Sequence, residues 1–518
     1  MSAVGPTAPA GEGAVPNRTI VTICVMLATI MQALDTTIAN VALPYMQGSL
    51  SATNDQINWV LTSYIVAAAI MTPPTGWLAA RFGRKPLFLV AVAGFTGASV
   101  LCGLASSLEQ MVLFRLLQGV FGAPLVPLSQ AVLLDSYPPE KHGSAMALWG
   151  VGVMVGPILG PTLGGYLTDA YNWRWVFYIN LFIGVATFFG LSAFLSDTVK
   201  DRTRGFDWFG FTTLSIAIGA FQMMLDRGEQ LDWFSSREVL FEAVAAGLAF
   251  YLFVSHTFTS SNPFIDPRAF KDRNFSAGLI LIFVVGVILL ATMALLTPYL
   301  QNLMGYPVLA AGLVMSPRGI GTMVAMMIVG RVISKIDPRL LIGLGLLLTA
   351  LSLWEMTGFT PDVSRFTLIR TGVIQGMGLG FCFVPLSTIA FATLEPHLRT
   401  QGTALFSLMR NIGSSIGISV VVFLLNRNTQ ILHASMTESV TPFSDLARQP
   451  EIAAHHWSLS TLQGLTSLNN EITRQAEIIA YNNDFLLMTW IALASLPLLL
   501  LLRKPQRIDK HAAAAALD

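Results

Sequence analysis

Long apolar runs recur along this chain, and they constrain its fold more than any other feature. Between residues 18 and 502 we count fourteen such runs, many of them longer than the roughly 18 apolar residues that mark a membrane-spanning helix. Hydrophobic residues make up 53% of the 518 residues and charged residues only 11%, whereas a soluble domain carries about 25% charged residues. We therefore predict a polytopic all-α membrane protein with fourteen transmembrane helices.

Composition and motifs argue against several other classes of protein. The formal net charge is +1, so the chain lacks the basic excess that attracts nucleic acid. It contains neither a phosphate-binding G-x-x-x-x-G-K-[ST] sequence nor a zinc-binding H-E-x-x-H sequence. We therefore expect a protein that is not an enzyme, with no catalytic residues, no metal and no cofactor. Cys24, Cys102 and Cys382 lie inside apolar runs, and we expect them to be buried.

An even number of spans places the two ends of the chain on the same side of the membrane. Basic residues are concentrated in the loops on that side, for example Arg81, Arg84 and Lys85, and are scarce in the short loops on the other. Because Lys and Arg collect in cytoplasmic loops, we predict that both termini are cytoplasmic. We expect residues 1–17 to form a disordered tail and residues 503–518 a second cytoplasmic tail.

A faint internal repeat divides the chain into two halves. The segment QGVFGAPLVPLS at 118–129 recurs as QGMGLGFCFVPLS at 375–387, and two further pairs of segments match in the same order at an offset of about 255 residues. Two parallel repeats related by an axis along the membrane normal are a transporter architecture. We predict a six-helix half at 18–200, an inserted two-helix pair at 201–262 and a second six-helix half at 263–502.

One loop on the non-cytoplasmic side is longer and more polar than the others. It spans residues 427–482 and contains the amphipathic stretch LSTLQGLTSLNNEITRQAEIIA. It is expected either to lie on the membrane surface or cap the protein, or to form a docking surface for a partner.

A carboxylate interrupts the first apolar run, in the segment MQALDTTIANVALP. A charge at membrane depth is costly and is by default a candidate functional group. From the rise of a helix, Asp35 lies roughly 23 Å from the inner end of its span, and Arg115 roughly 6–8 Å from the outer end of the fourth. The two charges therefore share the outer third of the membrane, and Gln118 lies on the same helix face as Arg115. Either both charges snorkel to the headgroups or they pair; Asp is too short to snorkel easily, which favours a functional pair.

The loop after the second span reads GWLAARFGRKPLF. Gly76 and Gly83 bracket a tight turn, and Arg81 and Arg84 hold it at the cytoplasmic face. Taken alone, this segment is an ordinary basic loop.

Small residues line one side of the fifth span, GVGVMVGPILGPTLGG. Four glycines recur at intervals of four and leave a stripe without side chains, which favours close helix packing, and two prolines are expected to bend the helix. The residues are Gly152, Gly156, Pro157, Gly160, Pro161 and Gly164.

Two polar residues, Arg410 and Asn411, lie roughly 13–15 Å into a span of the second half. They could line a substrate cavity. Arg410 could equally satisfy backbone carbonyls at a break in the helix.

Four features carry a family resemblance: the segments LDTTIANVALP, RLLQGVFGAPLVPLSQAVLLDSYPPEKHG and NWRWVFYINLFIG, and the fifth-span glycines. Together they resemble the fourteen-span drug:proton antiporters of the major facilitator superfamily, most of all the EmrB-type inner-membrane exporters. The resemblance covers residues 18–502. It departs from the family at Ala80, where an acidic residue that latches the cytoplasmic gate is usual, and at Phe182, where proline is usual.

The resemblance implies a multi-pass protein of the bacterial inner membrane that exports small lipophilic compounds, driven by the proton gradient. It further implies a periplasmic EmrA-like adaptor, an outer-membrane channel, and a glycine stripe that packs the fifth span against the other half. As a hypothesis, Asp35 exchanges the proton, Arg115 tunes it and Gln118 orients the pair. Met31, Asn40 and Tyr64 are expected to line the cavity.

Other functions remain as alternatives at this point. The nearest is an exporter of one metabolite, siderophore or fatty acid rather than of many drugs. The glycine–proline motif disfavours an importer or uniporter. The two-half repeat with gate-type loops disfavours a channel. No appended soluble domain or clustered reactive side chains support a receptor or a membrane enzyme.

Overall fold

The computed structural model describes residues 17–198, 200–201, 205–440 and 461–503, and these residues form helices and connecting turns without a strand. Thirteen helices are long and apolar enough to cross a membrane, judged by length and composition. The predicted all-α membrane class is confirmed. The predicted second span is divided into two shorter helices by Pro73 and Pro74, since proline removes a backbone donor and breaks a helix.

The first half of the bundle contains the helices up to residue 194. Their bounds are α1 Arg18–Ser49, α2 Asn54–Ile57, α3 Trp59–Met71, α4 Thr75–Phe82, α5 Arg84–Leu104, α6 Leu108–Gly122, α7 Leu125–Ser136, α8 His142–Ala170 and α9 Trp175–Phe194.

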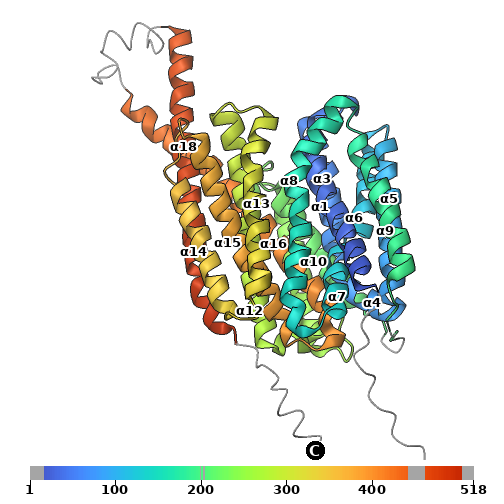
Figure 1. Cartoon of the computed structure of the whole chain (residues 1–518). Coiled ribbons are helices and arrows are strands. Elements are labelled where there is room, and N and C mark those ends of the chain that lie inside the picture. The colour runs from blue at the N-terminus through green and yellow to red at the C-terminus, as the bar shows by residue number, and fades with distance from the viewer. Residues whose placement is uncertain (1–16, 199, 202–204, 441–460, 504–518) are drawn as a thin grey trace, which may run out of the picture.

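The second half follows an inserted pair of helices, α10 Trp208–Arg227 and α11 Arg237–Thr259. It consists of α12 Arg273–Pro298, α13 Val308–Val332, α14 Pro338–Met356, α15 Arg365–Ala392, α16 Arg399–Ser439 and α18 Leu462–Ala494. The two halves stand side by side, with α8 and α13 facing each other between them (Figure 1).

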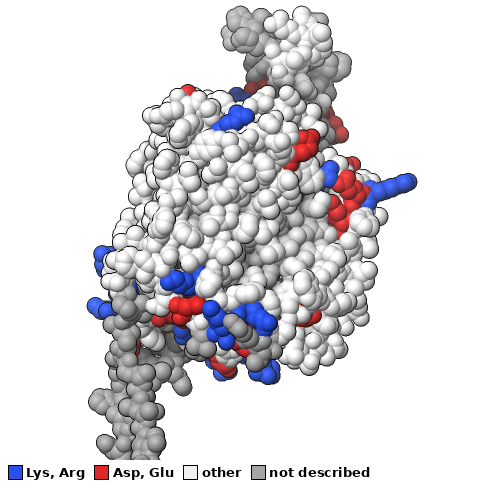
Figure 2. All heavy atoms as spheres, turned by 90° about the vertical axis from the view of Figure 1, so that its right-hand side faces the viewer, with Lys and Arg blue, Asp and Glu red and all other residues white. Residues whose placement is uncertain are grey.

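Both ends of the described chain lie at one end of the bundle, which we call the terminal end. Arg18 lies over the ring of Tyr137 at 5.2 Å, and the backbone N–H of Arg503 donates to Asn274 at 2.7 Å. Charged side chains gather near the two ends of the face in Figure 2 and leave a broad uncharged belt between them. Such a belt matches the apolar interior of a membrane.

Two helices continue beyond the bundle at the end opposite the termini. α16 extends to Ser439 and α18 begins at Leu462, so the described part of the 427–482 segment is largely helical. The helices point away from the bundle (Figure 1), and the expectation that this segment lies on the membrane surface is wrong for the described part. The connection 441–460 lies outside the described residues.

The glycine stripe of α8 packs against α1 of its own half. An added Cβ would lie 2.5 Å from the side chain of Met26 at Gly152 and 2.5 Å from the backbone of Ala33 at Gly156, and it would meet Thr37 at Gly160. Gly164 faces Ile38 in the same way, and α8 continues as one helix through Pro157 and Pro161, although neither has a backbone N–H to donate; the side chain of Pro161 lies outside the described ones.

The implied packing of this stripe against the other half is therefore wrong. A different face of α8 makes that contact, where Gly143 lies against Ile333, just past the end of α13, and Ala147 lies against Gly330 of α13. The glycine spacing indicates that another helix packs closely on α8, but it does not indicate whether that helix is α1 or α13.

Contacts between the halves concentrate at the terminal end. Arg84 Nε donates to Thr400 Oγ1 at 3.1 Å, and Thr403 Oγ1 donates to the carbonyl of Pro127 at 3.1 Å. Deeper in the interface, the Trp149 ring stacks on the ring of Phe383 at 5.7 Å between centroids. The bundle is thus closed at the terminal end.

The inserted helix α10 joins both halves near the opposite end. Asp226 accepts a hydrogen bond from Thr62 of α3. On its other side, the carbonyl of Leu225 accepts from Ser419 of α16 at 2.8 Å, and Glu229, just past α10, accepts from Asn426 at 2.6 Å. The inserted pair therefore braces the two halves from outside.

We expect Gly156→Ala to lower the apparent melting temperature of the purified protein in detergent by several degrees. The new methyl group would push α8 away from the backbone of Ala33, and overpacking of this kind costs about 1–3 kcal/mol. The control is Gly165→Ala on the same helix, where an added Cβ meets nothing within 4 Å. Equal melting temperatures for the two variants would contradict the close packing of α1 and α8.

Candidate functional site

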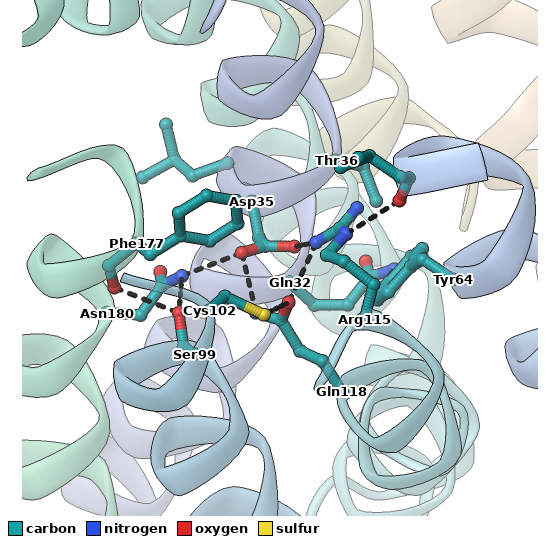
Figure 3. A network of polar contacts seen from close by, with 12 residues as sticks. Gln32, Asp35, Thr36, Tyr64, Ser99, Cys102, Arg115, Gln118, Phe177 and Asn180 are labelled. Carbon is teal, nitrogen blue, oxygen red and sulfur yellow. Dashed lines mark hydrogen bonds and ion pairs between the residues drawn. The ribbon is translucent and has the colours of Figure 1, made fainter. Parts of the chain in front are cut away.

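The carboxylate of Asp35 lies inside the first half and accepts hydrogen bonds from three side chains (Figure 3). Oδ2 accepts from Nη1 of Arg115 at 2.7 Å, and Oδ1 accepts from Nε2 of Gln118 at 2.7 Å and from Nδ2 of Asn180 at 2.8 Å. Asp35 is 2% exposed and Arg115 1%. The structure therefore brings together Asp35, Arg115 and Gln118, which the depth and spacing of the spans had placed near one another.

The guanidinium of Arg115 is fixed by further contacts. Nε donates to the carbonyl of Val60 at 3.0 Å, and Nη1 also donates to Oε1 of Gln118 at 2.8 Å. The ring of Tyr64 lies 4.4 Å from the guanidinium carbon, within the range of a cation–π contact. Gln118 thus donates to Asp35 and accepts from Arg115, which orients both members of the pair.

A second layer of polar residues was not recognised in the sequence. Asn180 also donates to Oγ of Ser99 at 2.9 Å, and Ser99 donates to the carbonyl of Phe177 at 2.9 Å. Sγ of Cys102 lies 3.6 Å from Oε1 of Gln118. Asn180 is the polar residue inside the apolar segment FYINLFIG, and that signal could have identified it.

Because the pair of Asp35 and Arg115 is buried, protonation of Asp35 would change the electrostatic energy of the site strongly. An ion pair inside protein is tolerated when hydrogen bonds satisfy its remaining atoms, and removing one partner leaves an uncompensated charge that costs about 3–5 kcal/mol. Protonation of Asp35 would likewise leave Arg115 without a counter-charge. The site can therefore report the arrival of a proton by breaking a contact between α1 and α6.

A polar face of α1 leads from this pair to an exposed surface. Gln32, Thr36 and Asn40 follow one another at intervals of four and so share one side of the helix. Asn40 is exposed, Thr36 and Gln32 are half-buried, and Nε2 of Gln32 donates to the hydroxyl of Tyr64 at 3.1 Å. Along α1, this face runs toward the end opposite the termini.

The predicted cavity residues occupy different environments. Met31 is fully buried and Tyr64 is 3% exposed, whereas Asn40 is exposed. In the second half, Asn411 is exposed and accepts a long hydrogen bond from Nη2 of Arg410 at 3.4 Å. Their assignment to a substrate cavity stays a prediction.

The basic loop at the terminal end takes part in a charged cluster that joins the halves. Asp135, at the end of α7, accepts from Arg84 and also from Nη1 of Arg399, the latter at 3.0 Å. Arg84 reaches this position because Gly83 turns the chain at a φ of 92°, which a residue with a side chain rarely adopts. Asp135 thus supplies a carboxylate to this cluster, near a loop that has Ala80 where the family resemblance leads us to expect an acidic residue.

The other loop residues support this arrangement. Gly76 packs against Gln401 of α16, where an added Cβ would lie 2.9 Å from its Cα. Arg81 lies in the last turn of α4.

Among the described residues, His, Cys, Asp and Glu form no group of three or more that could hold a metal ion. Cys24, Cys102 and Cys382 are buried, as predicted.

Comparisons with known proteins agree with this architecture. The family model described as Major Facilitator Superfamily matches residues 25–418. The multidrug export protein EmrB of Escherichia coli (strain K12) is 38% identical over 496 residues, which cover 95% of this chain and 96% of EmrB. The fatty acid resistance protein FarB of Neisseria gonorrhoeae is 38% identical over 494 residues, or 94% of this chain and 96% of FarB. The solved structure of the human organic anion transporter MFSD10 (TETRAN) aligns with 93% of this chain and all of its own at a TM-score of 0.59 and 13% identity, a likeness of fold alone.

We expect Asp135→Asn to favour opening of the terminal end. The change removes the negative charge between Arg84 and Arg399, and a loss of roughly 1–2 kcal/mol would shift the open–closed equilibrium about five- to thirty-fold. Pulsed electron paramagnetic resonance between spin labels at Lys141 and Lys335, one on each half, should show a longer distance. Asp169→Asn, an exposed carboxylate near the opposite end, is the control; an unchanged distance in Asp135→Asn would rule out this role.

Proposed function

The chain belongs to the Major Facilitator Superfamily, and we propose that it exports hydrophobic toxic compounds in exchange for protons. It is a multi-pass protein of the bacterial inner membrane. The relatives with 38% identity over nearly the whole chain are named for multidrug export and for fatty acid resistance. Those names support an efflux function, and the buried Asp35 site supports its coupling to protons.

The observation that carries the proton-coupling proposal is the threefold hydrogen-bonded carboxylate of Asp35. In the described conformation Asp35 and Arg115 neutralise each other at 2.7 Å, so the first half carries no net charge at this depth. A proton that binds Asp35 releases Arg115 and lets α1 and α6 separate. Loss of the proton restores the pair, so the proton gradient can bias the rocking of the two halves.

We propose fourteen spans, with α3 and α4 together forming the second, and both termini in the cytoplasm. The terminal end is then the cytoplasmic end, and its contacts between Arg84, Asp135 and Arg399 form the closed cytoplasmic gate. The polar face at Asn40 then opens toward the periplasm, where proton concentration is higher and substrate is released.

The projecting helices α16 and α18 support a proposal about partners. In this orientation they extend into the periplasm (Figure 1), where a periplasmic EmrA-like adaptor and, through it, an outer-membrane channel would be reached. The driving force is the proton gradient, with no cofactor.

A narrower function is also supported by one comparison. The FarB relative is named for fatty acid resistance and matches this chain as closely in identity as EmrB does, at 38%. An exporter of one class of fatty acids is therefore the second candidate. A growth screen of a deletion strain against drugs and fatty acids distinguishes the two, since a multidrug exporter protects against both groups.

We expect Asp35→Asn to abolish proton movement driven by substrate in proteoliposomes. Asparagine keeps the size of the side chain and can still accept a hydrogen bond, but its amide cannot bind and release a proton as a carboxylate does. The measurement is the change in lumenal pH, reported by a trapped dye, when substrate is added to one side. Folding is checked by size-exclusion chromatography and by the melting temperature.

Glu471→Gln is the matched control, because Glu471 is a carboxylate on the projecting part of α18 that contacts Arg474 and Gln475. It should transport normally. Proton movement that persists at the wild-type rate in Asp35→Asn would refute Asp35 as the coupling site, whereas its loss in both variants would point to a general defect.

A further inference from the structure

The second half contains a counterpart of the Asp35 site that lacks the carboxylate. The repeat aligns Gln118 with Gln375, an offset of 257 residues, and the same offset relates Asp35 to Thr292 and Arg115 to Gly372. The hydrogen bond of the first half has an equivalent: Nε2 of Gln375 donates to Oγ1 of Thr292 at 3.2 Å, as Nε2 of Gln118 donates to Asp35 at 2.7 Å. The polar scaffold is thus conserved between the halves, but its negative charge is not.

A cation is nevertheless present at this counterpart site. Arg318 belongs to α13, and α13 packs on α15 in the same way as α3 packs on α6. The carbonyl of Arg318 lies against Gly376 of α15, and the carbonyl of Tyr64 lies against Gly119 of α6. A Cβ at Gly372 would lie 3.7 Å from Cβ of Arg318. The arginine of the second half therefore enters from the neighbouring helix, beside the position that Arg115 has in the first.

Arg318 differs from Arg115 in its partners. Nη2 donates to the carbonyl of Leu289 at 3.0 Å, whereas Nη1 is buried without a hydrogen-bond partner, as is Oε1 of Gln375. Arg318 is 6% exposed and Gln375 0%. Within the described part of the chain, no carboxylate forms an ion pair with Arg318, while Arg115 has one at 2.7 Å.

An unpaired buried charge is costly, and a protein retains one where a ligand supplies the counter-charge. Guanidinium groups bind carboxylates with charge-assisted hydrogen bonds, and one guanidinium neutralises one negative charge. On α12, Leu289 lies in an apolar stretch, which suits a ligand whose remaining part is apolar. We propose that Arg318 is the binding site for the carboxylate of a lipophilic monoanion, with Gln375 as a neighbouring polar contact.

This inference rests on the proposed export function and specifies a substrate class for it. In the first half, Asp35 balances the charge of Arg115, whereas in the second half Arg318 forms no ion pair with a described carboxylate. A bound monoanion would supply the counter-charge that Arg318 lacks.

The test compares two aromatic probes of similar size and opposite charge, naphthalene-2-carboxylate and protonated 2-(aminomethyl)naphthalene. Equilibrium binding of each radiolabelled probe to the purified full-length protein is measured at neutral pH. Arg318→Met should weaken carboxylate binding about ten-fold or more, the value of a hydrogen bond to a charged group, and leave amine binding unchanged or tighter. Arg318→Lys should retain most of the carboxylate affinity.

A second variant tests the same site without removing the arginine. Gln375→Glu places a carboxylate beside Arg318, and this internal counter-ion should also weaken binding of the naphthalene carboxylate ten-fold or more. Arg370→Met is the control, since Arg370 pairs with Glu355 at 3.0 Å on an exposed surface. Its affinity for both probes should equal that of the wild type.

The melting temperature separates ligand binding from a structural role. Removal of an unpaired buried charge should leave the melting temperature of Arg318→Met unchanged or raise it, whereas a purely structural arginine would lower it and weaken both probes equally. Equal weakening of both probes, or none, overturns the site.

The outcomes also separate this site from the proposed function. A wild type that exports the amine with proton uptake but does not bind the carboxylate overturns the anion site alone. A wild type that binds the carboxylate through Arg318 but moves no protons overturns proton-coupled export alone.

Discussion

One buried carboxylate organises the first half of this protein. Asp35 of α1 is bonded to Arg115 and Gln118 of α6 and to Asn180 of α9. Through Arg115 the same network reaches the backbone of α3, and through Asn180 it reaches α5. Five helices therefore meet at a single charge that cannot be left unpaired in a membrane interior. An event that neutralises this charge acts on a network that contacts all five helices, as the proposed coupling role of Asp35 requires.

The two halves share a scaffold but not a charge. Gln118 and Gln375 make equivalent hydrogen bonds, to a carboxylate in one half and to the hydroxyl of Thr292 in the other. In the first half, Asp35 and Arg115 neutralise each other. In the second half, Nη1 of Arg318 is buried without a hydrogen-bond partner. Under the two proposals made above, similar frames hold a proton site in the first half and an anion site in the second.

Much of this arrangement follows from the sequence, and the exceptions have physical causes. Helix rise and span order placed Asp35 and Arg115 at one depth, and the structure joins them. Asn180 interrupts an apolar segment, which is a signal for a polar site, but spacing within its own helix does not reveal its partners on α1 and α5. The glycines of α8 indicated close packing without saying which neighbour they approach, and α1 proved to be that neighbour. Likewise, Ala80 signalled a missing gate carboxylate, but only the fold shows that Asp135 lies between Arg84 and Arg399.

The inserted helices α10 and α11 have a further consequence. α10 is bonded to Thr62 in the first half and to Ser419 in the second, and α11 is largely exposed on the outside of the bundle. In the proposed rocking of the halves, this pair follows both of them and displaces the surrounding lipid. Part of the work of each cycle is therefore done against the bilayer, whose thickness and stiffness set the cost of that displacement. The turnover of this protein should accordingly depend on lipid chain length even for a substrate that never touches lipid.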